Sequence, residues 1–176
     1  MPHAQPKSRR GDTRSLQLEI HATAGRHLVP ALRTLLPRAH RLAGSRAAHL
    51  SVALVGRRRM RRLNKRFLRH DRLTDCLSFA LEQDTRGRAL SGELIICVPV
   101  ALARARRLGL PLLSEVLLYA VHGLLHLDGW DDKNKDEFAA MHRREDKILS
   151  QMGLGNVFAA DATAASSIRA RLRGNL

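Results

Sequence analysis

The chain has 176 residues, of which 44% are apolar and 27% charged, a composition that excludes a disordered or collagen-like polymer and fits one soluble domain. Its 31 Lys and Arg residues outnumber its 16 Asp and Glu residues by 15, and 26 of those 31 are Arg. An excess of this size attracts polyanions, so nucleic acid is the first partner to consider. The alternative explanation is an arginine bias that only solvates the surface.

We expect a flexible N-terminus over residues 1–14, a single domain over 15–154 and a weakly ordered basic tail over 155–176. No apolar run reaches the length of a membrane span, and the polar N-terminus lacks the apolar core of a secretory signal. Cys76 and Cys97 stand apart in apolar runs, which predicts small core residues without a disulfide partner. These features favour a cytoplasmic protein that does not contact membranes.

In chain order, the first predicted element is a half-buried strand at 16–20, where apolar and polar residues alternate. Helical spacing follows at 26–40, with Pro30 tolerated in the first turn. The alternation returns at 50–54 and predicts a second strand.

A basic helix is predicted next, at 57–68. Met60, Leu63 and Phe67 stand at helical spacing within it, and we expect all three to face the core. The remaining positions of this helix are mostly Arg and Lys, so its outer face should be strongly cationic.

Short apolar runs at 76–81 and 93–98, separated by a polar turn, predict two neighbouring strands. Three helices are predicted after them, at 99–108, at 113–127 and from about residue 133 or 136 to 152. Together these elements predict an α+β fold, in which a small sheet of about four strands is flanked by about five helices.

Two histidines stand four residues apart in the predicted helix at 113–127. His122 and His126 therefore project from one helix face and can reach a single ion. Gly129 follows the helix and permits a sharp turn, which can return Asp132 to the same ion as a third ligand. Three protein ligands leave one coordination position open, as in a catalytic metal site at the end of a buried helix. The alternative is a pair of core histidines that only form hydrogen bonds.

The ligand spacing is similar to that of the metalloprotease helix, in which a Glu directly after the first His is the general base. Gly123 occupies that position here and cannot accept a proton. A zinc peptidase therefore remains an alternative, but hydrolysis of peptides by the usual route is disfavoured.

Three segments of the chain carry the motifs of a known family in the family's order and spacing. They are Leu63-Asn64, Phe67, His70-Asp71, Thr74-Asp75 and Leu77-Ser78-Phe79; then Gly92-Glu93-Leu94-Ile95-Ile96; then His122 to Asp132 with Glu137, Met141, Glu145 and Ile148-Leu149. On these residues the chain resembles the YbeY family of metal-dependent endoribonucleases, which act in bacterial ribosomal RNA maturation.

The resemblance implies one zinc ion per chain, held at the end of the long buried helix by His122, His126 and Asp132. It implies cleavage of single-stranded ribosomal RNA, including processing of the small-subunit 3′ end and ribosome quality control, with the small ribosomal subunit as partner. His122 and His126 are then catalytic residues, and His70 is a candidate phosphate contact or proton donor.

Two positions depart from the family. Asp132 stands where the family usually has His, and a carboxylate also binds zinc but lowers the net charge at the ion by one. Leu68 occupies the place of the family's functional Arg. Both departures favour a further alternative, a catalytically silent RNA-binding metalloprotein in which the metal only braces the loop.

The charge of the chain is divided unevenly. Residues 57–72 contain nine basic side chains and one acid, whereas residues 128–147 contain seven acids and five bases. We expect RNA phosphates to contact the basic helix, through Arg58, Arg62, Arg66 and Arg69. Because aromatic residues make up only 3% of the chain, we expect backbone and shape readout, with Trp130 packed beside the metal loop. The alternative for Trp130 is a platform on which a base stacks.

Overall fold

A computed structural model of the chain describes residues 16–69 and 71–155. The expectations for the N-terminus over residues 1–14, for the tail from residue 156 onward and for His70 lie outside these residues.

The centre of the fold is a four-stranded sheet with the order β1-β2-β4-β3. Strands β1 (Gln17–Ala22), β2 (His49–Val55) and β4 (Ala89–Cys97) are parallel, and β3 (Cys76–Gln83) pairs antiparallel with β4 at one edge. The predicted α+β class and the number of strands are confirmed. Strand β4 begins four residues before its predicted start, and Val98 opens the next helix rather than ending the strand.

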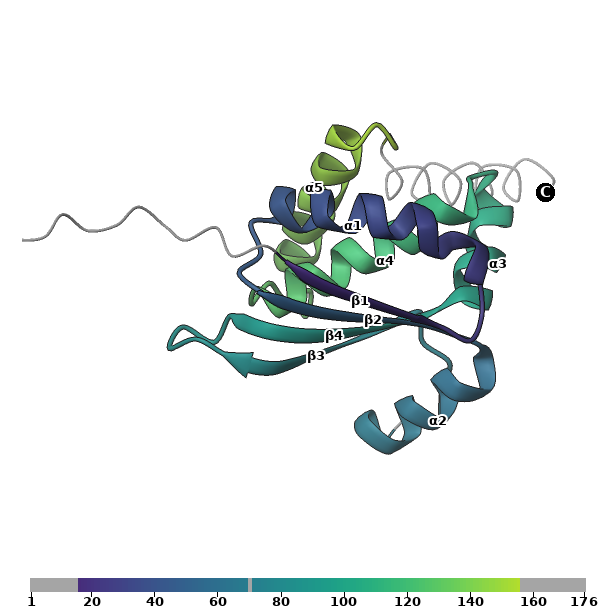
Figure 1. The fold of residues 1–176 in the computed structure, drawn as a ribbon, viewed down its shortest axis with the longest axis horizontal. Coiled ribbons are helices and arrows are strands. Elements are labelled where there is room, and N and C mark those ends of the chain that lie inside the picture. Colours follow the sequence, from purple (N-terminus) through teal and green to yellow (C-terminus); the bar gives the residue numbers. More distant parts are fainter. Residues whose placement is uncertain (1–15, 70, 156–176) are drawn as a thin grey trace, which may run out of the picture.

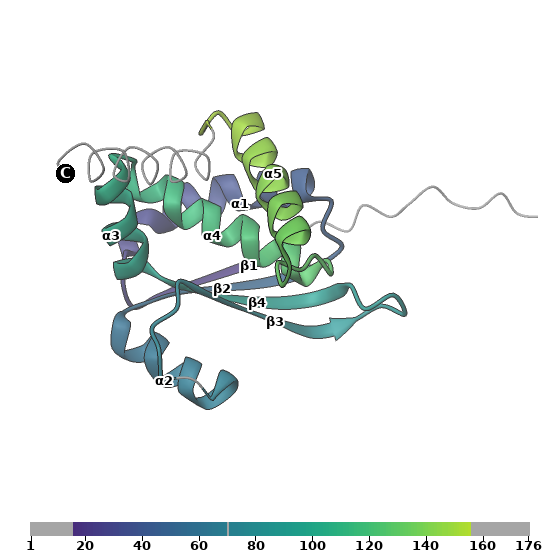
Figure 2. The ribbon, with the colours of Figure 1, turned by 180° about the vertical axis from the view of Figure 1, so that it is seen from behind.

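Helices cover both faces of the sheet. A short 3-10 turn at Arg26–Leu28 leads into α1 (Val29–Ala43), and α3 (Val98–Leu108), α4 (Leu112–Leu127) and α5 (Lys135–Gln151) lie with it on one face. Helix α2 (Arg57–Leu68) lies alone on the opposite face, as Figures 1 and 2 show.

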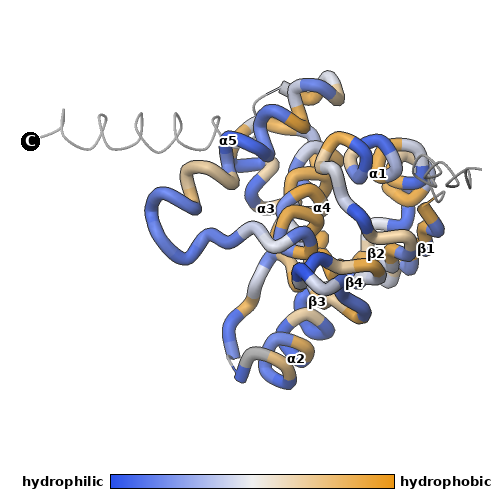
Figure 3. The backbone as a smooth tube through the Cα atoms, turned by 90° about the vertical axis from the view of Figure 1, so that its left-hand side faces the viewer, coloured by the Kyte–Doolittle hydropathy of each residue, from blue (hydrophilic) through white to orange (hydrophobic). Residues whose placement is uncertain are grey.

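Helix α4 is the hydrophobic centre of the larger layer. Most of its residues are buried, and it appears as a nearly continuous hydrophobic segment in Figure 3. Two glycines allow it to lie very close to β4. A Cβ atom on Gly123 would come within 2.6 Å of Leu94 Cδ2, and one on Gly92 within 2.6 Å of Leu127 Cδ1. Neither α4 nor any other helix within residues 16–69 and 71–155 is long and apolar enough to cross a membrane.

Helix α2 has a smaller core of its own. Met60 is fully buried against the outer face of the sheet, where Val55, Leu77 and Ile95 surround it. The prediction that Phe67 also faces the core is wrong, because 52% of that residue is exposed.

Phe67 lies in the last turn of α2, beside the edge strand β3. Among the described residues its ring has one aromatic neighbour, Phe79 of β3, at a centroid distance of 5.0 Å, and the Arg66 guanidinium lies 5.6 Å from its centroid. The helical spacing indicated the correct face of the helix, but at this turn the sheet covers the ring only in part.

The difference between Met60 and Phe67 predicts unequal effects on stability. We expect Met60→Ala to lower the free energy of unfolding by about 2–5 kcal/mol, because its side chain is fully buried. Phe67→Ala should cost roughly half as much or less, since the ring already contacts water. Urea unfolding of both variants measures the two losses, and equal losses would contradict the packing of α2 described above.

Candidate metal centre

Three potential metal ligands converge where α4 ends. His122, His126 and Asp132 each offer one ligand atom, and these atoms lie within 4.8 Å of one another. The two histidine Nε2 atoms are 3.0 Å apart, and the Asp132 carboxylate oxygens lie 4.0 Å and 3.9 Å from them. Gly129 has a φ of +89°, so the turn that returns Asp132 uses the conformational freedom of glycine. The structure therefore brings together the three ligands predicted from the spacing.

The hydrogen bonds of the two imidazoles orient both Nε2 atoms toward a shared point. His126 Nδ1 is 3.0 Å from the backbone oxygen of Trp130, which can only accept, so Nδ1 carries the proton. His122 Nδ1 donates to Glu145 Oε1 at 2.8 Å. In neutral rings both Nε2 atoms then present lone pairs, and two lone pairs that face each other at 3.0 Å repel unless a proton or a metal ion is shared between them.

The donor set fits a zinc ion. Two ligands of a tetrahedral zinc ion, each about 2.0–2.1 Å from the metal, lie about 3.3–3.4 Å apart. The spacing of the Nε2 atoms is slightly shorter and that of the carboxylate slightly longer, so small side-chain movements reach that geometry. The side chains of His122 and His126 are 25% and 27% exposed, so the ligand face is open to solvent and substrate.

A buried carboxylate supports the first ligand. The side chain of Glu145 on α5 is fully buried and accepts hydrogen bonds from His122 and from His142. Burial alone would raise the pKa of Glu145, but these two hydrogen bonds outweigh it and hold that pKa below its ordinary value. Burial opposes protonation of His122, yet the hydrogen bond and charge of Glu145 raise the His122 pKa, with smaller contributions from the charges of Asp75 and Asp132.

The roles of Glu145 and His142 were not predicted from the sequence. One signal was available: Glu145 lies among Met141, Ile148 and Leu149, at helical spacing on the buried face of α5. A charged residue at such a position requires a polar partner, because an unpaired buried charge is costly. The spacing does not show which residue of another helix is that partner.

The environment of Gly123 argues against a peptidase. A Cβ atom at this position would meet Leu94 Cδ2 at 2.6 Å and Cys76 Sγ at 3.4 Å. A Glu side chain, which the metalloprotease mechanism requires here, would have to enter this apolar contact between α4 and the sheet.

Both cysteines are free, and burial raises the pKa of each thiol, which keeps them protonated and unreactive.

The other acidic residues near α4 have separate partners. Asp131 forms an ion pair with Lys133 and accepts a hydrogen bond from the backbone N–H of Asp132, which holds the loop. Asp128 accepts from the backbone N–H of Arg46. Glu115, near the start of α4, lies 3.6 Å from Arg104. The partners given for Asp131, Asp128 and Glu115 are not the ligand imidazoles. The acid that forms a hydrogen bond with a ligand imidazole is Glu145.

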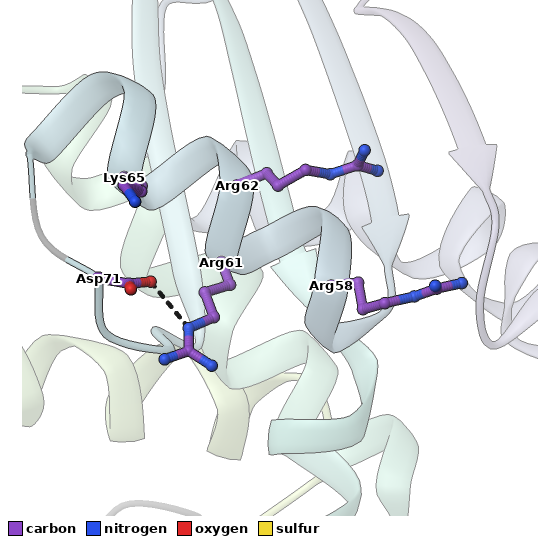
Figure 4. A pocket seen from close by; sticks show the side chains of 5 residues that line it. All are labelled: Arg58, Arg61, Arg62, Lys65 and Asp71. Carbon is purple, nitrogen blue, oxygen red and sulfur yellow. Dashed lines mark hydrogen bonds and ion pairs between the residues drawn. The ribbon is translucent and has the colours of Figure 1, made fainter.

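The basic face of α2 surrounds a surface cavity of about 520 Å³. Four basic side chains and one acidic side chain line it, and Figure 4 shows them: Arg58, Arg61, Arg62, Lys65 and Asp71. Arg61 donates to Asp71 Oδ1 at 2.8 Å, which leaves the other cations of the cavity without an acidic partner among the described residues.

Two of the four predicted RNA-binding residues, Arg58 and Arg62, line this cavity. Arg66 lies against Phe67 instead, and Arg69 ends α2 in the left-handed conformation with a φ of +56°. Arg61 and Lys65 were not among the predicted contacts, although they share the helix face of Arg58 and Arg62.

Comparison with known proteins gives a consistent result. The family model described as "Endoribonuclease YbeY" matches residues 15–153. Proteins of that name are 37% identical in Aromatoleum aromaticum over 112 residues (64% of this chain, 71% of the relative) and 35% identical in Chlorobium luteolum over 141 residues (78% and 98%). A solution structure from Thermotoga maritima has a TM-score of 0.55 at 24% identity and covers 77% of this chain and 91% of its own, so it shares the fold.

The contact between Glu145 and His122 predicts an effect on metal affinity. We expect Glu145→Gln to weaken zinc binding by about 10- to 100-fold, because the neutral amide no longer holds His122 Nδ1–H by charge. Competition with a chromophoric chelator measures this affinity. The control is Glu137→Gln, which removes an exposed charge from the first turn of the same helix and should change the affinity by less than about twofold. Equal effects of the two variants would show that Glu145 acts only through net charge.

Proposed function

The chain belongs to the endoribonuclease YbeY family, and on this premise we propose that it is a metal-dependent endoribonuclease that cuts single-stranded RNA during ribosomal RNA maturation. The proposal includes one zinc ion per chain as cofactor and the small ribosomal subunit as partner in the cytoplasm. Processing of the small-subunit 3′ end and ribosome quality control are the cellular roles we assign to it.

One observation carries the proposal: His122, His126 and Asp132 converge at a solvent-accessible point, and residues 16–69 and 71–155 offer these three protein ligands there. A structural zinc site uses four protein ligands and is closed, whereas three ligands leave a position for water or substrate. When bound, a zinc ion supplies Lewis acidity toward a phosphoryl oxygen and lowers the pKa of a water molecule in the open position.

The chain's own residues prepare this site. Glu145 and the Trp130 carbonyl hold the Nδ1 protons of His122 and His126, which fixes both rings with Nε2 toward the centre. The Asp132 carboxylate makes the centre one charge less positive than a third His would. Because Gly123 offers no side chain that could take the proton of an attacking water, that proton must go to solvent or to an RNA phosphate oxygen. The leaving oxygen must take its proton from solvent or from His70, which we retain as a candidate donor.

The basic face of α2 is the surface we assign to RNA. We propose that Arg58 and Arg62, with their neighbours in the cavity, contact backbone phosphates, and that Arg66 and Arg69 extend this surface along the end of the helix. Phosphate contacts of this kind fix the position of an RNA but do not read its sequence.

A catalytically silent RNA-binding metalloprotein is the second candidate. It is favoured by Leu68 in the place of the family's functional Arg and by Asp132 in the place of a ligand His. This candidate predicts binding of RNA and metal without metal-dependent cutting.

Purified protein and structured ribosomal RNA, with and without chelator, test the enzyme directly. We expect cleavage that stops with chelator, returns when zinc is restored, and falls at least a hundredfold in His126→Ala, because two ligands hold the metal poorly. RNA that stays intact in all of these reactions would support the catalytically silent RNA-binding metalloprotein. Cleavage that persists unchanged in His126→Ala would overturn the proposed mechanism, and cleavage of casein would revive the peptidase.

Salt dependence tests the RNA surface. Each phosphate contact adds about 0.7 to the slope of log K against log salt for a single strand. We expect Arg58→Ala with Arg62→Ala to reduce that slope by about 1.4, measured by fluorescence anisotropy at several salt concentrations. Arg33→Ala removes an exposed charge from α1 on the other layer and should leave the slope unchanged. Equal slopes in the unaltered protein, the double variant and Arg33→Ala would show that the RNA binds to a surface other than α2.

A further inference from the structure

Four large hydrophobic side chains are exposed in the part of the chain that the structure describes: Phe67, Leu81, Trp130 and Phe138. Two of them, Trp130 and Phe138, lie on either side of the metal ligand Asp132 in the sequence and are 40% and 44% exposed. The expectation that Trp130 is packed beside the metal loop is therefore only partly met, since its indole is substantially exposed to solvent. Exposed aromatic rings near an open site are available to a ligand that binds there.

The backbone of Trp130 is fixed by the metal centre. Its N–H donates to the Leu125 carbonyl at 3.0 Å, and its own carbonyl accepts from His126 Nδ1 at 3.0 Å. A large rearrangement of Trp130 would break the hydrogen bond that orients a metal ligand. The exposed indole is therefore presented from a constrained position next to His126.

Phe138 is fixed from the other side of the loop. It lies in the first turn of α5, where its N–H donates to the Asn134 carbonyl at 2.9 Å. Its ring meets the His142 ring edge to face, with centroids 4.1 Å apart. His142 shares the Glu145 carboxylate with His122, so a chain of three contacts joins Phe138 to the candidate ligand His122.

The charges of the chain around the candidate metal centre attract phosphates less than those on α2. Residues 128–147 carry seven acids and five bases, whereas residues 57–72, on α2 and just after it across the sheet, carry nine bases and one acid. Apart from a bound metal ion, the segment 128–147 therefore supplies no net positive charge to hold RNA, and further affinity there has to come from uncharged contacts. Stacking of a base on an aromatic ring is such an interaction and contributes about 5- to 150-fold in affinity per base.

We propose that Trp130 and Phe138 are stacking platforms for unpaired nucleobases that flank the phosphate at the metal centre. The inference rests on the proposed function, because it needs RNA as the ligand of the site. Bases in a duplex already stack on each other and cannot reach these rings, so the two platforms favour single strands over duplexes. The rings thus supply the selection for unpaired RNA, and the basic face of α2 supplies affinity for its backbone.

Trp130 is the one tryptophan of the chain, so its emission reports directly on its surroundings. The experiment titrates the full-length protein, in chelator to prevent cutting, with an unstructured RNA dodecamer, with the same dodecamer annealed to its complement, and with inorganic polyphosphate. We expect the single strand to quench Trp130 emission, and the duplex and polyphosphate to bind without quenching. Binding of the single strand, seen by anisotropy, with unchanged emission would overturn the proposal, as would equal quenching by polyphosphate.

Variants provide the second arm of the experiment. Trp130→Ala and Phe138→Leu should each weaken binding of the single strand by about 5-fold or more, because each removes one ring. Trp130→Phe keeps a ring and should retain most of the affinity. Leu81→Ala removes an exposed apolar side chain from β3 and should change nothing. Equal affinities in all four variants would reject stacking.

Two parallel measurements separate this inference from its premises. Zinc affinity of Phe138→Leu, measured by chelator competition, should equal that of the unaltered protein, which shows that the loop is intact. Cleavage of ribosomal RNA with zinc present tests the enzyme independently. Cleavage of ribosomal RNA without a change in Trp130 emission would support the endoribonuclease activity and reject the stacking proposal. Quenching of Trp130 emission without cleavage would reject the enzyme and support the base-binding site.

Discussion

The close packing of α4 against β4 is the constraint on which the metal centre depends. Gly123 and Gly92 each leave space for a leucine of the opposite element, so the helix lies nearer to the sheet than side chains of ordinary size allow. This contact fixes the position at which α4 emerges from the core, and therefore the position of His122 and His126. The same contact removes the residue type that would make the site a peptidase, since the space beside Gly123 is filled by Leu94.

The site combines a rigid interior with an open exterior. Glu145 is buried and joins α5 to α4 through His122, while the exposed parts of the ligands face solvent. A carboxylate that holds the distal nitrogen of a ligand histidine fixes the ring and increases its basicity. His142 completes the hydrogen bonding of that carboxylate, so the negative charge lies in the core between two imidazoles. Within the acidic segment, the buried charge of Glu145 therefore has a structural cause, which is support of the candidate ligand His122.

The two layers of the fold present different surfaces. The cavity of α2 carries three cations beyond its ion pair, whereas the segment around the candidate metal centre is acidic and presents the exposed rings of Trp130 and Phe138. The first is the surface that we propose for the RNA backbone, and the second is the one that we propose for unpaired bases. The low total of aromatic residues led to the expectation of backbone and shape readout, and the exposed rings of Trp130 and Phe138 are the observation from which we propose base stacking in addition.

The amino-acid sequence is enough to predict the order and type of the elements, the family and the three candidate ligands, because helical periodicity and a glycine turn are local geometry. His122, His126 and Asp132 lie within eleven residues, so no distant contact was needed to bring them together. Three features follow only from the packing of the chain: Glu145, on another helix, supports His122; Arg61 and Lys65 join Arg58 and Arg62 around one cavity; and about half of Phe67 is exposed. Periodicity identifies the face of a helix that turns inward, but burial depends on how far the neighbouring sheet extends and on which helices pack together.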